Sequence, residues 1–163
     1  LHWLTIIFVF NQFFSINYYK YLPKSDPLKR FILVNWHKPM GFILLFITVL
    51  FILWRIKEKV RPSLEDISIY ERIAAKMVHL AIFIFLFLQT VSGIIMSNAS
   101  GYAIKIMGVA MPMFVAKDQA LSKFAHEAHS ILGGLLFLLI LVHIFAALKH
   151  HFWDKNDILA RMF

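Results

Sequence analysis

Two histidines, His129 and His143, lie 14 residues apart inside an apolar run, where ionisable side chains are costly. The 21 residues from Ala128 to Leu148 carry no formal charge and could cross a hydrocarbon core of about 30 Å as a helix. At about 100° and 1.5 Å per residue, both imidazoles leave one face of that helix, roughly 21 Å apart in depth. This arrangement predicts two stacked metal centres; the alternative is a pair of histidines hydrogen-bonded to neighbouring helices.

The composition limits the chemistry that such centres can use. The chain has 163 residues, of which 60% are hydrophobic and 16% are charged, and these values are typical of a small bundle of membrane helices. Cysteine is absent, which excludes disulfides, iron–sulfur clusters and thiolate ligation. Any metal must therefore be bound by the eight histidines, the seven methionines or carboxylates.

The apolar segments predict an all-α integral membrane protein, an antiparallel four-helix bundle with short or medium loops. We expect one domain over residues 1–163, with helices at about 1–19, 35–56, 69–97 and 122–152. We expect Pro23 and Pro27 to break the first loop and Pro39 to lie in the first turn of the second helix. The apolar part of the third connection, residues 104–115, could form a short interfacial helix.

The distribution of charge orients the bundle. In this topology both termini lie on one side of the membrane, with nine basic and six acidic residues against eight and three on the other side. The sequence starts at Leu1 without Met, so we expect preceding residues to add to the nine, and no signal peptide is visible. The positive-inside rule then places the termini in the cytoplasm, in a multi-pass protein of the bacterial inner membrane. The basic outer face would attract an anion or contact lipid headgroups.

The same topology matches histidines by depth. His2 and His143 fall near the inner side, and His37 and His129 near the outer side. Two ligands at each depth favour bis-histidine ligation of two haems, because a zinc site needs three or four converging ligands. Glycines four residues after each outer histidine, Gly41 and Gly133, would let a flat macrocycle approach the backbone.

Two further histidines are candidates for supporting roles. His126 precedes Glu127 and is the rival ligand to His129, but its spacing to His143 takes it about 100° off the histidine stripe, so we expect an interfacial or supporting role. His79 should lie at the inner depth. It could bond a haem propionate or a quinone, or make an ordinary bond between helices.

The chain resembles the bacterial cytochrome b561 family of four-helix, di-haem membrane cytochromes over essentially its whole length. The motifs that carry the resemblance are HWL at 2–4, PKSD at 23–26, His37 with Gly41, His79 with Gly93, and His129 and His143 followed by FAALKHHFWDKNDILARM. The 14-residue spacing is shared with cytochrome b subunits of formate dehydrogenases and nickel–iron hydrogenases. The absence of extra domains favours the stand-alone type.

The resemblance implies two b haems, bound by His2 with His143 and by His37 with His129. The family ligand usually directly precedes the Glu of an HE pair, which here would select His126; we favour His129 on its spacing. The stand-alone enzymes are superoxide oxidases, which pass electrons from superoxide to ubiquinone. Superoxide would then react at the outer haem, with Lys38 and Lys123 as candidates for steering it, and no acid–base catalytic residue is expected.

Two other functions remain as alternatives. One is a cytochrome b electron-transfer subunit that serves a dehydrogenase or hydrogenase through a redox partner protein. The other is a haem-free transporter or structural bundle, whose purified form would be colourless. The expected surroundings are the lipid bilayer, and no nucleic-acid partner is expected.

Overall fold

The computed structural model describes residues 1–57 and 68–155 and is almost entirely helical. Its elements are α1 (His2–Tyr21), α2 (Pro27–Phe31), the π-helix η1 (Ile32–His37), α3 (Lys38–Lys57), α4 (Ile69–Ala99), β1 (Lys105–Ile106), β2 (Val109–Ala110) and α5 (Gln119–Phe152). Of the nine basic residues that the sequence assigns to the side of the termini, three (Lys59, Arg61 and Arg161) lie outside the described residues.

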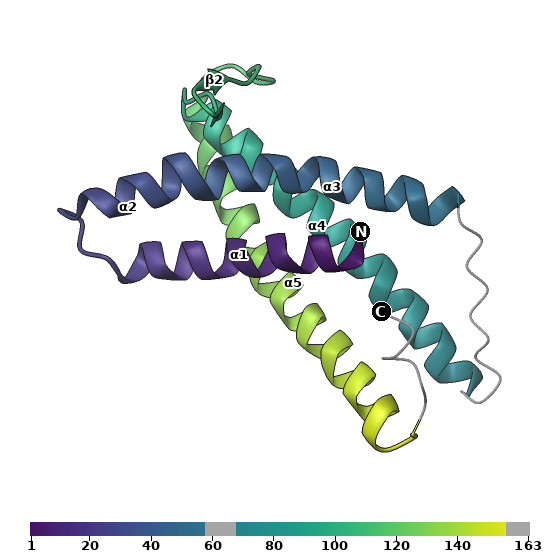
Figure 1. The fold of residues 1–163 in the computed structure, drawn as a ribbon. Coiled ribbons are helices and arrows are strands. Elements are labelled where there is room, and N and C mark those ends of the chain that lie inside the picture. Colours follow the sequence, from purple (N-terminus) through teal and green to yellow (C-terminus); the bar gives the residue numbers. More distant parts are fainter. Residues whose placement is uncertain (58–67, 156–163) are drawn as a thin grey trace.

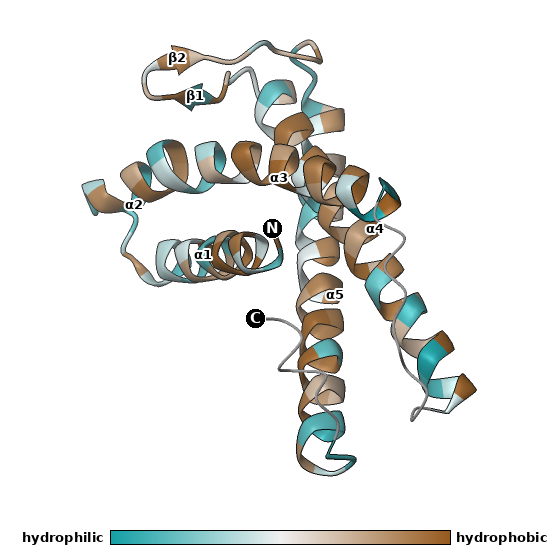
Figure 2. Ribbon diagram, turned by 45° about the vertical axis from the view of Figure 1, so that its right-hand side comes forward, coloured by the Kyte–Doolittle hydropathy of each residue, from teal (hydrophilic) through white to brown (hydrophobic). Residues whose placement is uncertain are grey.

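The helices form two antiparallel pairs that cross one another obliquely, α1 with α3 and α4 with α5 (Figure 1). The protein is therefore an all-α membrane bundle, as the sequence predicts, although the two pairs are not aligned along one axis. In the described part of the chain, three helices are long and apolar enough to cross a membrane: Pro27–Lys57, Ile69–Ala99 and Gln119–Phe152. Apolar residues cover most of their length in Figure 2.

The second span begins earlier than the sequence pattern indicates. The Asp26 side chain accepts a hydrogen bond from the Leu28 N–H, and Pro27 occupies the first turn of α2, so Pro27 starts a helix and does not break one. The helix then continues through η1 into α3. Pro39 therefore lies inside it, where a proline ring displaces the carbonyl four residues earlier. The π-helix immediately before Pro39, in which the Lys38 N–H bonds the Leu33 carbonyl, accommodates this displacement and ends at His37.

Capping side chains also set the starts of the other two long helices. Ser68 accepts a hydrogen bond from the Glu71 N–H at the start of α4. Asp118 accepts hydrogen bonds from Ala120 and Leu121, so α5 starts three residues before the expected position.

The connection between α4 and α5 is a β-hairpin, and the expected interfacial helix is wrong. Lys105 pairs with Ala110 and Ile106 with Val109. Met107 and Gly108 form the turn with φ values of 49° and 87°, which a right-handed helix does not allow.

The buried core has two parts. Val9, Leu44, Leu86 and Leu136, one from each long helix, pack at the centre of the bundle. Phe42, Ile94 and Ile104 pack at its outer end beneath the hairpin. Between these clusters the four helices hold the outer histidines.

Candidate functional site

His37 and His129 are brought together from different helix pairs. His37 ends η1 and His129 lies on α5, and their ring centres are 6.4 Å apart with the rings nearly perpendicular, at 87°. Two imidazoles that bind one metal ion from opposite sides, with metal–nitrogen bonds of about 2.0–2.1 Å, have ring centres roughly 6.3 Å apart. The observed separation therefore fits a bis-histidine centre.

Hydrogen bonds fix the tautomer of His129. Its Nδ1 lies 2.9 Å from the backbone oxygen of Gln89 and 3.2 Å from the hydroxyl of Ser92. A carbonyl oxygen can only accept, so Nδ1 carries the hydrogen and Nε2 keeps its lone pair. The Gln89 side-chain amide nitrogen lies 3.1 Å from that Nε2 and donates to it. Metal-binding histidines are generally held through the ring nitrogen that does not bind the metal, as the Gln89 carbonyl holds Nδ1 here. The Gln89 amide occupies the lone pair of Nε2, so this side chain has to turn away before Nε2 can bind a metal.

His37 is also held through Nδ1, by residues of α1. The Ser15 hydroxyl is 3.0 Å from Nδ1, and the Gln12 amide nitrogen is 2.9 Å from it. The same Gln12 amide bridges the His37 carbonyl, at 3.2 Å, and the Gly41 N–H, at 3.1 Å. Both contacts fall on Nδ1. For Nε2 to bind a metal, Nδ1 has to carry the ring hydrogen and donate it, to the Ser15 hydroxyl or to the oxygen of a rotated Gln12 amide.

Three glycines make room for these side chains. A Cβ on Gly93 would lie 2.9 Å from Cε1 of His129, so only glycine leaves space for this imidazole. A Cβ on Gly133 would lie 3.1 Å from the Gln89 amide nitrogen, and one on Gly41 would lie 3.6 Å from Gln12. The sequence predicts that Gly41 and Gly133 make room for a macrocycle. In the structure, the groups next to them are the side-chain amides of Gln12 and Gln89, which contact the two histidines.

A cavity of about 740 Å³ lies between the helices around His37 and His129. Its volume is within the range of cavities that hold cofactors, roughly 300–1,000 Å³. All four long helices line it, mainly with apolar side chains, and the Gln89 Oε1 atom is buried there without a partner in the described part of the chain. The imidazole pair, the apolar walls and the few buried polar groups fit a b-type haem bound by two histidines.

Basic side chains also line this cavity. Lys38 lines it and donates a hydrogen bond to the Ser97 hydroxyl at 3.0 Å, with its ammonium 5.5 Å from the centre of the Tyr102 ring. Lys20 also lines it. Lys123, the other candidate from the sequence, is exposed on α5 and does not line it.

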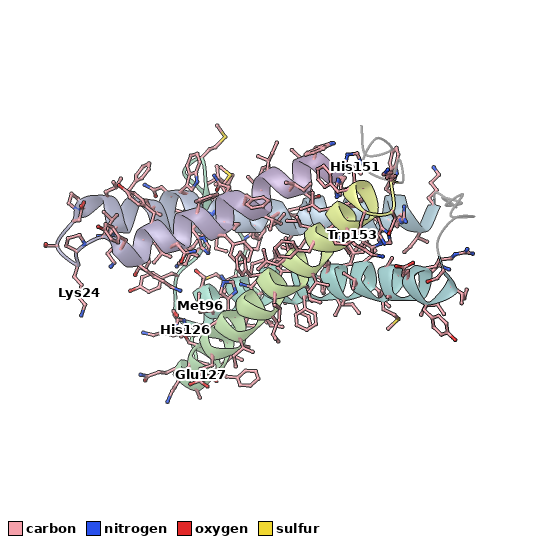
Figure 3. All side chains as sticks on the ribbon, turned by 90° about the horizontal axis from the view of Figure 1, so that it is seen from below. Lys24, Met96, His126, Glu127, His151 and Trp153 are labelled. Carbon is pink, nitrogen blue, oxygen red and sulfur yellow. The ribbon has the colours of Figure 1, made fainter. Side chains whose placement is uncertain are left out.

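His126, the alternative ligand to His129, does not lie against His37. It lines the cavity but is exposed, and its Nδ1 lies 3.3 Å from the sulfur of Met96 (Figure 3). Of the two candidates, His129 is the one whose ring lies against His37.

The inner end of the bundle gathers His79 and His143 together with His2, the three histidines that the sequence places at this depth. The rings of His79 and His143 are 4.9 Å apart. The His2 ring packs against Trp3 at 6.0 Å and Phe51 at 6.4 Å, and lies close enough to both other imidazoles to interact with them electrostatically. The separation of His79 and His143 is too short for a metal ion between opposed ligands.

A polar cluster lies just beyond these histidines. The Lys149 ammonium is 2.6 Å from Glu71 and 3.0 Å from Asp154, and His150 is 2.7 Å from Asp154. The hydrogen bond from Lys149 is the main cause that holds the pKa of the Asp154 carboxyl below its usual value. Glu71, His150 and Asp154 offer three possible metal-ligand atoms within 4.8 Å of one another, but Lys149 already pairs with both carboxylates.

Several of these residues escape detection in the sequence. Gln12 and Ser15 can be suspected, because polar residues in a membrane span generally turn inward and bond to other helices. Gln89, Ser92 and Lys20 were not predicted. The available signal for Gln89 is that it is a single amide after nine apolar residues, four positions before Gly93.

An apolar helical bundle with two facing imidazoles across an internal cavity, and no cysteine, defines the class of membrane b-type cytochromes. Residues 1–163 match the family model described as prokaryotic cytochrome b561, and the chain belongs to this family. It is 34% identical to "Cytochrome b561 homolog 2" of Escherichia coli over 99% of this chain and 86% of that protein.

Two further relatives are more distant. "Cytochrome b561 homolog 1" of Escherichia coli is 24% identical, over 99% of this chain and 92% of its own length. "Probable superoxide oxidase CybB" of Yersinia pestis is also 24% identical, over 99% of this chain and 90% of its own length. The protein is thus a membrane b-type cytochrome of an oxidoreductase family that binds b-type haem.

Proposed function

We propose that this protein takes electrons from superoxide at the outer, periplasmic face of the bacterial inner membrane and passes them to ubiquinone. The observation that carries the proposal is the cavity in which His37 and His129 face one another and which Lys38 and Lys20 reach from the outer end. The name of the Yersinia pestis relative supports the same substrate. We further propose that both termini are cytoplasmic.

The outer haem would be bound by Nε2 of His37 and of His129. In support, the Gln89 carbonyl and the Ser92 hydroxyl hold His129 Nδ1, and Ser15 and Gln12 hold His37 Nδ1. A group that accepts a hydrogen bond from Nδ1, as the Gln89 carbonyl does at His129, orients a ligand ring and raises its basicity. A bis-histidine haem supplies one-electron transfer without an open coordination position.

The inner haem would be bound by His2 and His143, roughly 21 Å from the outer one in depth. His79 would then be a neighbour of this centre and a candidate hydrogen-bond donor to a propionate or a quinone. Its ring contact with His143 supports this role.

The lysines of the outer cavity would attract the anionic substrate. Lys38 is tethered to Ser97, so its ammonium stays beside the cavity at no further cost in side-chain freedom. Two superoxide ions each give one electron and leave as O₂. One ubiquinone accepts both electrons and two protons and becomes ubiquinol, so atoms and charge balance.

Superoxide-driven reduction of ubiquinone in proteoliposomes tests the proposal. We expect Lys38→Met to lower kcat/KM roughly threefold to tenfold, and added salt to remove most of the difference. Lys123→Met is the matched control, since Lys123 does not line the cavity, and it should stay close to the unsubstituted protein.

Two results would contradict the proposal. If the protein reduced no ubiquinone at the expense of superoxide while a dehydrogenase or hydrogenase partner did reduce its haems, it would be an electron-transfer subunit. Equal effects of the Lys38 and Lys123 substitutions on kcat/KM would contradict the proposed entry of superoxide past Lys38. The rate of superoxide-driven ubiquinone reduction in the unsubstituted protein would still test the substrate.

A further inference from the structure

The hairpin between α4 and α5 has two faces of different character. On one side, Ile104 is buried with Phe42 and Ile94, which all line the cavity, and Ile106 and Met111 pack against this cluster. The hairpin therefore closes the outer end of the cavity. On the other side, large apolar side chains are exposed.

The tip of the hairpin is the most exposed apolar part of this connection. Met107 is 99% exposed and Val109 is 64% exposed, and Tyr102, Met113 and Phe114 are exposed beside them. A turn with two positive φ values favours Asn–Gly or Asp–Gly, whose side chains also suit water. Here Met107 takes the first position, at φ 49°, so the sequence places a long apolar side chain where backbone conformation and hydration both disfavour it.

The charges around this tip fit a lipid surface. Residues 98–117 contain Lys105 and Lys117 but no acidic residue. Lysine side chains extend their apolar stems along an interface and place their charge among anionic headgroups. The hairpin also directly follows α4 and precedes α5, so it continues from surfaces that already face lipid.

We propose that the tip of this hairpin, Met107 with Val109, inserts into the headgroup–acyl boundary of the outer leaflet. Apolar residues flanked by lysines are bound there by burial of apolar area and by attraction to anionic lipid. The opposite face, through Ile104, holds the end of the cavity closed. The hairpin is thus a cap anchored in the membrane.

The absence of cysteine allows a clean test with single labels. A nitroxide attached at Met107→Cys, in the full-length haem-loaded protein in nanodiscs, reports its depth through collisions with oxygen, which concentrates in lipid, and with a nickel chelate, which stays in water. The matched control is Lys24→Cys, an exposed position in the α1–α2 turn (Figure 3), which the proposed topology places on the same side of the membrane as the hairpin. Val109→Cys provides a second site if the Met107 variant folds poorly.

We expect the ratio of oxygen to nickel accessibility to be several-fold higher at Met107→Cys than at Lys24→Cys. Equal ratios at the two positions would overturn the proposal, because the tip would then lie in water. Protection of Met107→Cys from both reagents, with broadening between labels, would also overturn it, because a second copy of the chain would then cover the tip. The labels report depth alone, so the result is independent of the redox function proposed above.

Discussion

The outer and inner histidine groups differ in how firmly their rings are held. At the outer site, each imidazole is bonded through Nδ1 by side chains or backbone of a neighbouring helix, and the two rings are spaced for a metal ion between them. At the inner end, the rings of His79 and His143 contact one another, the His2 ring packs against Trp3 and Phe51, and His79 is exposed. Similar residue types at a regular spacing thus give one pair of firmly held imidazoles and one group of three, from which we propose that two bind a haem.

Removal of an outer ligand should have the largest effect. His129→Ala should lose the outer haem, so that pyridine haemochrome titration falls from two haems to about one per chain. His126→Ala should retain both, since His126 contacts Met96 and not His37. Loss of haem in the His126 variant with retention in the His129 variant would reverse the ligand assignment.

Three matched substitutions test which histidines bind the inner haem. His143→Ala and His2→Ala should each reduce the count to about one haem, whereas His79→Ala should leave two. The same titration measures all three variants. If His79→Ala lost a haem and His2→Ala did not, the inner ligands would be His79 and His143, whose rings are in contact.

Crowding of the outer site should have a smaller effect. In Gly93→Ala the new Cβ would lie 2.9 Å from Cε1 of His129, and overpacking of this kind costs about 1–3 kcal/mol. We expect a lower content of outer haem and a lower Tm. Gly134→Ala is the control, because a Cβ there meets nothing within 4 Å. Equal behaviour of the two variants would show that the His129 ring is not confined as described.

Loss of one supporting hydroxyl should tune the outer haem without removing it. Ser92→Ala deletes a contact to Nδ1 of His129, which makes the ligand less basic and the ferric state less stable. The outer midpoint potential should rise by roughly 20–60 mV, the one-electron equivalent of a hydrogen bond. Redox titration of both haems measures this shift, and a change confined to the inner haem would contradict the assignment.

The smallest effect concerns the polar cluster at the inner end. The pKa of Asp154 is lower in the folded protein than its ordinary value of 3.8. The ion pair of Asp154 with Lys149 therefore stabilises the fold fully at pH values above 3.8, and this stabilisation is lost as the pH falls through the lower folded pKa. The Tm difference between the unsubstituted protein and Asp154→Asn should therefore be small at neutral pH and vanish at low pH. A difference that grew on acidification would have the wrong sign.

Much of the architecture follows from the sequence because apolar runs and histidine spacing report directly on helices. The 14-residue spacing on one helix face and the four apolar segments predict the bundle and the meeting of His37 with His129. The start of the second span at Asp26–Pro27 was missed because proline was interpreted as a breaker, although the capping signal was present.

Other features depend on tertiary contacts that no local pattern encodes. The packing of α4 against α5 brings the Gln89 amide to His129 and the ring of His79 to that of His143. The hairpin follows from a turn with two positive φ values, for which Met107 gives no sequence signal. The charge of the outer side predicted an anion route, but only the fold separates Lys38 from Lys123.

The most direct test of the central claim is the absorption difference spectrum of the purified protein with superoxide as the only reductant, recorded beside His129→Ala. We expect a b-type α-band that appears with superoxide and disappears when ubiquinone is added. In His129→Ala, dithionite should still reduce the remaining haem whereas superoxide should not. A band that dithionite raises but superoxide does not, in the unsubstituted protein, would contradict the account and favour an electron-transfer subunit. The absence of any band would favour the haem-free alternative.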